Sequence, residues 1–86
     1  MSVISAQVSL YPLRQVDIGP AIREAVRILR SHDLTVRPGE MSTLVWGEAD
    51  VVFAALRAAF DQAAAVGDTV MTVTLSNACP LPADGP

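Results

Sequence analysis

The feature that most constrains the fold is an alternation of apolar and polar side chains in two segments near opposite ends of the chain. Residues 3–11 (VISAQVSLY) and 69–76 (TVMTVTLS) place apolar side chains at every second position. A period of two is that of a β-strand with one buried and one uncovered face. Both segments are therefore predicted to be strands of a sheet that is covered on one side only.

Two segments between these strands carry helical periodicity instead. Residues 18–31 and 49–65 have apolar side chains three and four positions apart, which predicts two amphipathic helices. Asp17 is a suitable N-cap for the first helix, and Glu48 with Asp50 favours the start of the second. The side chains expected to be buried by the second helix are Val52, Leu56, Ala59, Phe60 and Ala63.

Two short strands are predicted between the helices, at 34–37 and 41–46, with a turn at Pro38–Gly39 and Gly47 ending the second strand. The element order is then βαββαβ. This order predicts an α+β, ferredoxin-like sandwich, in which a four-stranded antiparallel sheet carries both helices on one face. The other face of the sheet is left open, and its covering is the functional question.

Length and charge limit the classes of function. With 86 residues and a net charge of −3, the chain fits one domain (1–78) followed by a flexible Pro-rich tail (79–86) and shows no basic stripe for nucleic acid. No apolar run reaches the roughly 20 residues of a membrane span. A single cysteine, Cys79, and no Cys/His spacing argue against a metal site. We expect a cytoplasmic protein that assembles with copies of itself.

The open face is predicted to mix hydroxyls with a few apolar groups. Alternation places Ser9 and Tyr11 of the first strand there, and Ser76 of the last strand. In the third strand, Thr43 is expected to pack under the helices with Val45, so that Ser42, Leu44 and Trp46 are open. Such a surface suits an oligomer interface with a small-ligand pocket. It also suits a plain half-solvated sheet.

Three stretches, in register over nearly the whole chain, resemble the small bacterial and archaeal thiamine-binding protein family. They are AQVSLYPL followed by DIGPAIREAVRIL (6–29), PGEMSTLVWGEADVVFAALRAAF (38–60) and TVTLSN (72–77). The resemblance implies a ferredoxin-like subunit that pairs through its sheet into homodimers, often assembled into homotetramers. It also implies that thiamine or its hydroxymethylpyrimidine part binds near the subunit interface, without catalysis and without a further cofactor.

Carried onto this sequence, the resemblance assigns ligand binding to hydroxyl-bearing residues. These are Ser9, Tyr11, Ser42, Thr43 and Ser76, whose hydroxyls can recognise the polar edge of an aminopyrimidine. Trp46 departs from the family pattern, in which an acidic residue more often precedes the glycine. The indole would then either stack on the ligand ring or anchor a subunit interface.

Two other functions remain open on the sequence alone. One is an enzyme of the dimeric ferredoxin-like barrel type, such as a monooxygenase using Trp46, Asn77 and His32; His32, however, falls at a helix end, where it suits the helix dipole. The other is a regulatory module whose open face makes only subunit contacts. Arg14 and Arg37 are candidates for holding a phosphate, with a solvated surface as the alternative.

Overall fold

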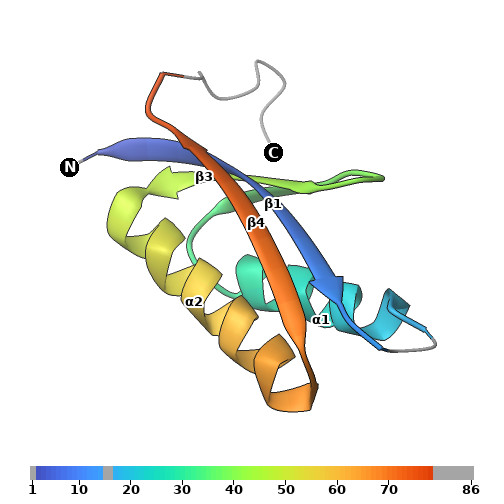
Figure 1. Ribbon diagram of the computed structural model, residues 1–86. Coiled ribbons are helices and arrows are strands. Elements are labelled where there is room, and N and C mark those ends of the chain that lie inside the picture. Colours follow the sequence, from blue (N-terminus) through green and yellow to red (C-terminus); the bar gives the residue numbers. More distant parts are fainter. Residues whose placement is uncertain (1, 15–16, 79–86) are drawn as a thin grey trace.

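The protein is described from a computed structural model, in which residues 2–14 and 17–78 are described. Its elements, in chain order, are β1 (Val3–Pro12), α1 (Gly19–Arg30), β2 (Thr35–Pro38), β3 (Thr43–Glu48), α2 (Ala49–Val66) and β4 (Thr69–Ser76). The four strands form one sheet, in the order β2-β3-β1-β4, and both helices pack on one face of it (Figure 1). The predicted βαββαβ ferredoxin-like fold is confirmed. The predicted flexible tail, 79–86, lies outside the described residues.

All strand pairings are antiparallel, and their register sorts the side chains by face. Ala6 of β1 lies opposite Val45 of β3 and Leu75 of β4, and residues directly opposite each other share a face. Ala6 and Val45 are 1% and 0% exposed and belong to the core. This row therefore fixes the helix-covered face, and the neighbouring positions on each strand belong to the open face.

The core between the sheet and the helices is built from small and branched aliphatic side chains. Its buried members are Ala6, Val8, Ala25, Leu29, Val45, Val52, Ala55, Leu56 and Ala59. Each fully buried Val or Leu contributes roughly 1.5–3 kcal/mol of transfer free energy. The many alanines let α2 lie close to the sheet, which leaves little room for a large ring.

The prediction that Phe60 is buried is wrong, for this steric reason. Phe60 is 39% exposed, while Ala55 is fully buried in the face of α2 that packs on the sheet. Phe53, seven positions earlier, is 53% exposed, and residues seven apart lie on the same side of a helix. The two phenylalanines therefore point outward together.

The predicted bounds of the third strand also need correction. β3 runs over Thr43–Glu48, so it begins two residues later than expected and continues through Gly47. A Cβ at Gly47 would lie 2.3 Å from Cδ2 of Leu34. A methyl group at this position would have to push aside the end of the flexible Leu34 side chain on the helix-covered side, and Gly47 does not end the strand. Because side chains alternate between the two faces with a period of two, a shift of two residues in the bounds leaves each residue assigned to the same face of the sheet.

Of the two predicted caps, Glu48 is confirmed as the N-cap of α2, whereas the prediction for Asp17 is wrong, because the N-cap of α1 is Ile18 and Asp17 lies one residue before it. The Asp17 carboxylate accepts from the Gly19 N–H at 3.0 Å, and the Glu48 carboxylate accepts from the Asp50 N–H at 3.1 Å. At the other end of α1, Nδ1 of His32 lies 2.9 Å from the carbonyl oxygen of Ile28. His32 therefore contacts the C-terminal carbonyls of α1, as its position in the sequence predicted.

Candidate functional site

The open face consists of side-chain rows that cross all four strands. One row, which we call the Trp46 row, contains Thr35, Trp46, Ser5 and Ser76 in register. The next row contains Arg37, Leu44, Gln7 and Thr74. The predicted position of Trp46 on the open face is thereby confirmed, and Thr43 lies on the helix-covered face with Val45, as predicted.

The Trp46 row is closely filled although it lies on the open face. Trp46 is 7% exposed and Ser5 is 9% exposed. The indole nitrogen of Trp46 is enclosed and has no hydrogen-bond partner among the residues that the structure describes. The Ser5 hydroxyl donates to the Ser76 carbonyl at 3.4 Å, and the Ser76 hydroxyl accepts from the Ala78 N–H at 3.0 Å. Little ring surface of Trp46 is therefore left for a ligand to stack on.

The opposite end of the β1–β3 pair is built differently. The paired register ends at Val8 and Thr43, so Ser9 and Ser42 occupy the next positions on the two segments. The Ser9 hydroxyl donates to the Met41 carbonyl at 3.3 Å, and the Gln7 side-chain amide donates to the Ser42 hydroxyl at 3.2 Å. Two serine side chains are thereby held near each other at the start of β3.

A tight turn fixes the position of Ser42. The Gly39 N–H donates to the Ser42 carbonyl at 2.8 Å, which closes the turn between β2 and β3. A Cβ at Gly39 would lie 2.9 Å from that same carbonyl oxygen. The turn therefore tolerates only glycine at position 39 without moving the backbone of Ser42.

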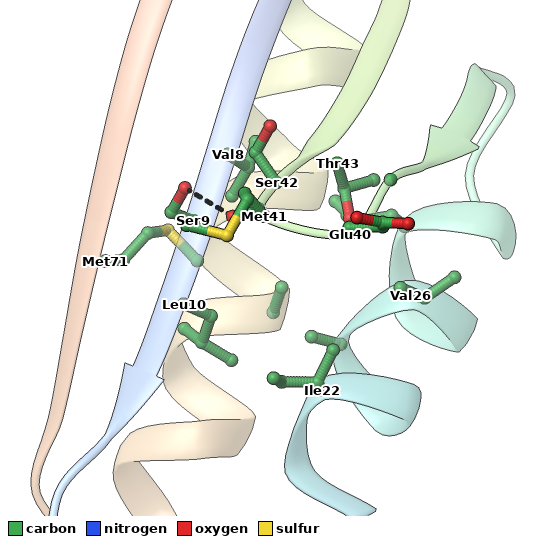
Figure 2. Close-up of a pocket in the computed structure, with 14 residues that line it drawn as sticks. Val8, Ser9, Leu10, Ile22, Val26, Glu40, Met41, Ser42, Thr43 and Met71 are labelled. Carbon is green, nitrogen blue, oxygen red and sulfur yellow. Dashed lines mark hydrogen bonds between the residues drawn. The ribbon is translucent and has the colours of Figure 1, made fainter. Parts of the chain in front are cut away.

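Next to this turn lies a cavity of about 70 Å³, which we call the turn cavity (Figure 2). Its aliphatic walls come from β1, α1 and β4 and include Leu10, Ile22, Val26, Leu29 and Met71. Ser9, Ser42 and Thr43 line it as well. Among the described residues of its lining, Glu40 alone is charged.

The structure therefore separates the six predicted site residues into two groups. Ser9, Ser42 and Thr43 line one cavity, and Tyr11 lies one pleat further along β1, 47% exposed. Trp46 and Ser76 belong to the Trp46 row. Four residues along a strand from Ser42 to Trp46 correspond to about 13 Å. One small ring cannot contact both groups at once.

The turn cavity by itself is smaller than a ligand ring. Its 70 Å³ compares with about 150 Å³ for a cavity that holds one benzene molecule. An aromatic ligand would fit its edge into the cavity and leave the rest under another surface. Sequence reasoning missed Glu40, Ile22 and Val26 as lining residues. The one signal for them was the turn PGEMS, which brings the start of β3 beside Ser9.

A second cavity, of about 200 Å³, lies between α1 and α2. Its walls include Ala21, Ala25, Ala59 and Ala63, with Glu24 and Gln62 as polar members of its lining. Glu24 accepts a hydrogen bond of 2.9 Å from Nε of Arg27, and this bond, with the positive charge of Arg27, lowers the pKa of the Glu24 carboxyl. None of the six predicted site residues lines this cavity.

Within residues 2–14 and 17–78, no group of three or more His, Cys, Asp or Glu side chains is placed to hold a metal ion. In that part of the chain, no helix is both long and apolar enough to span a membrane.

Residues 3–82 match the model of the YKOF-related family. The chain therefore belongs to this family. No curated protein matches the chain significantly.

Several solved structures share the fold. Hypothetical protein MJ1052 of Methanocaldococcus jannascii superposes with a TM-score of 0.83 at 23% identity, covering 88% of this chain and 80% of that one. A domain of unknown function, DUF77, from Bacillus cereus gives a TM-score of 0.78 at 16% identity, covering 96% and 85%. TM0486 of Thermotoga maritima is provisionally described as a thiamine biosynthesis/salvage protein. It superposes with a TM-score of 0.77 at 13% identity, covering 86% of this chain and 82% of that one. At these identities the similarity establishes a common fold.

Proposed function

We propose that the protein binds thiamine, a thiamine phosphate or a related aminopyrimidine without catalysing a reaction, as a cytoplasmic homo-oligomer with its ligand pockets near the subunit interface. The observation that carries the proposal is the pair of hydroxyls, Ser9 and Ser42, at the turn cavity. Family membership and the fold shared with TM0486 of Thermotoga maritima support the same class of ligand.

The two hydroxyls have complementary hydrogen-bonding capacity left over. A serine hydroxyl can donate one hydrogen bond and also accept. Ser9 already donates to Met41, so its oxygen can accept; Ser42 already accepts from Gln7, so its proton can be donated. An aminopyrimidine edge carries an amino donor beside a ring-nitrogen acceptor. The pair Ser9 and Ser42 matches that edge in both roles.

The surroundings of the serines suit the rest of such a ring. Leu10, Ile22 and Val26 provide an aliphatic floor, which gains free energy when it is removed from water against an aromatic face. Because the cavity encloses less than one ring, the outer part of the ligand would lie on the open face. Tyr11 and Val70, opposite each other there, are 47% and 46% exposed.

A second copy of the chain is the proposed cover for the open face. A sheet covered on one side only, in so short a chain, leaves apolar and polar groups that pairing with a second copy would bury. Ser9 and Ser42, which occupy open-face positions at the end of the β1–β3 pair, would then lie at the border of the interface. A homodimer, or a homotetramer built from two of them, is the assembly that this arrangement favours.

The placement of His32 supports a binding role over a catalytic one. A general base must lie within hydrogen-bond reach of its substrate. His32 contacts the C-terminal carbonyl of Ile28 on α1, away from the turn cavity lining. The alternative is a regulatory module that binds no ligand. It differs from the proposal only in the absence of binding, so a ligand titration distinguishes the two.

Isothermal titration calorimetry tests the proposal directly. We expect thiamine or hydroxymethylpyrimidine to bind, and Ser9→Ala and Ser42→Ala each to weaken binding about three- to tenfold, the value of one neutral hydrogen bond. Ser2→Ala is the matched control, because Ser2 is exposed and uses only its backbone carbonyl, which accepts from Ala49. No heat with thiamine, its phosphates or hydroxymethylpyrimidine at high micromolar concentration would overturn the proposal. Light scattering of the same samples measures the oligomeric state.

A further inference from the structure

We infer that Glu40 makes the turn cavity selective for a cationic, unphosphorylated ligand such as thiamine itself, over neutral pyrimidines and over thiamine phosphates. This inference rests on the proposed function, because it concerns the same site. It adds a specificity-determining residue that lies outside the group of hydroxyls and identifies the charge of the preferred ligand.

The turn cavity has two polar sides with an aliphatic floor between them. Ser9 and Ser42 lie on one side, whereas Glu40 lies on the side of Thr43 and of Val26 on α1 (Figure 2). Ile22 and Leu10 lie below (Figure 2). A ligand that spans the cavity would therefore present a donor–acceptor edge at one end and a positive charge at the other.

The two rings of thiamine have this order of groups. The aminopyrimidine carries the donor–acceptor edge, and a single methylene joins it to a positively charged thiazolium. Glu40 is two residues from Ser42, a separation of at most about 7 Å along the backbone, which is comparable with the separation of the two rings. With the pyrimidine edge at the serines, the thiazolium would lie beside the Glu40 carboxylate. Hydroxymethylpyrimidine lacks this charge and would gain nothing from Glu40.

The same carboxylate disfavours phosphate. The phosphates of thiamine monophosphate and diphosphate are carried on the thiazolium side of the molecule, so they would approach Glu40 as like charges. The described residues that line the turn cavity include no arginine. Arg14 pairs with Asp68, and Arg37 lies on the open face opposite Leu44. Neither of these two arginines lines the cavity.

Titrations of the full chain and of Glu40→Gln with three ligands test the inference. The probes are hydroxymethylpyrimidine (neutral), thiamine (cationic) and thiamine diphosphate (anionic). We expect Glu40→Gln to weaken thiamine about two- to fivefold, as for an exposed ion pair, to leave hydroxymethylpyrimidine unchanged, and to strengthen the diphosphate. Raising the salt concentration should reduce thiamine binding to the wild type more than to Glu40→Gln, because salt screens exposed charges. Asp61→Asn changes the net charge equally at an exposed site that pairs with Arg57 on α2, and should alter none of the three affinities.

The outcomes separate the inference from the proposed function. If no ligand binds the wild type, the proposed function fails and the inference with it. If the ligands bind but Glu40→Gln changes thiamine and hydroxymethylpyrimidine by the same factor, the binding function stands and the role of Glu40 is overturned. Tighter binding of the diphosphate than of thiamine by the wild type would also overturn it.

Discussion

The two ends of the β1–β3 pair carry similar hydroxyl-bearing side chains, yet they differ in what surrounds them. At one end, Ser5 lies beside an indole that is 7% exposed, Ser76 lies beside Ser5, and the hydroxyls of both serines are engaged locally. At the other end, Ser9 and Ser42 line a cavity with an aliphatic floor. The difference teaches that a conspicuous residue and a binding site need not coincide. A large buried ring fills space, whereas two small hydroxyls beside a tight turn leave space open.

The largest expected effect concerns the closed end. Trp46→Ala should destabilise the protein by about 3–5 kcal/mol, as for other buried large-to-small substitutions. Where the variant is folded, its affinity for thiamine should equal that of the wild type. Trp46→Phe should lose far less stability, because it keeps a ring and removes an indole N–H that has no partner among the described residues. Urea denaturation measures the free energy of unfolding of both variants. A loss of thiamine affinity in Trp46→Phe would indicate that the ligand binds at the Trp46 row and not at the turn cavity.

Two glycines give a paired comparison. Gly47→Ala places a methyl group against the flexible end of the Leu34 side chain, which can move aside, so it should cost no more than about 1 kcal/mol of stability with no change in affinity. Gly39→Ala forces a methyl group against the Ser42 carbonyl, a backbone atom, so it should displace Ser42, weaken thiamine binding and cost more stability than Gly47→Ala. Thermal unfolding and titration of both variants check this. Equal losses of affinity in the two would contradict a site confined to the turn.

Serine substitutions at the two ends should differ more modestly. Ser42→Ala should weaken ligand binding about three- to tenfold, and Ser76→Ala should leave the affinity unchanged. Ser76→Ala removes only the acceptor for the Ala78 N–H, an exposed bond near the end of β4. Parallel titrations measure both, and a larger effect of Ser76→Ala would break the proposed distinction between the ends.

The smallest effect is expected on the helix layer, away from both ends. The hydrogen bond from Arg27 lowers the pKa of the Glu24 carboxyl, so this pair stabilises the fold at neutral pH. Its contribution is lost as the pH falls below the ordinary pKa of a glutamate and through the lowered pKa of the folded state. Glu24→Gln should therefore show a slightly weaker loss of Tm on acidification than the wild type, with unchanged ligand affinity. If Tm fell more steeply with falling pH in Glu24→Gln than in the wild type, the stabilising role of the ionised Glu24 carboxylate would be contradicted.

Much of the fold could be predicted because the spacing of apolar side chains in the sequence directly indicates strands and helices. Period-two alternation located β1 and β4, and helical spacing located α1 and α2, each within about two residues of the observed bounds. The bounds of β3 are shifted by two residues at both ends, because the strand begins at Thr43 and continues through Gly47. Local sequence cannot show that Gly47 lies against Leu34, which comes from the segment just before β2. Phe60 was misplaced for a similar reason, since only the packed sheet shows how little room lies beneath α2.

The candidate site was harder to predict, because a cavity is made by several elements together. Alternation gave the faces of Ser9, Ser42 and Thr43, but not their shared lining with Ile22 and Val26 of α1. Trp46 was placed on the correct face of the sheet. Its burial could not be predicted, because the period-two alternation gives only the face on which a side chain lies. The contribution of Glu40 depends on how the turn at Gly39 is closed, which is a matter of backbone hydrogen bonding.

The central claim is that ligand binds at the turn cavity and not at the Trp46 row. It is tested most directly by a two-dimensional ¹⁵N–¹H NMR titration with thiamine, because Trp46 is the only tryptophan of the chain and gives a single indole N–H signal. We expect saturable shifts of the Ser9, Ser42 and Thr43 amides, with the Trp46 indole signal unmoved. A large shift of that indole signal, with the Ser9 and Ser42 amides unmoved, would contradict it.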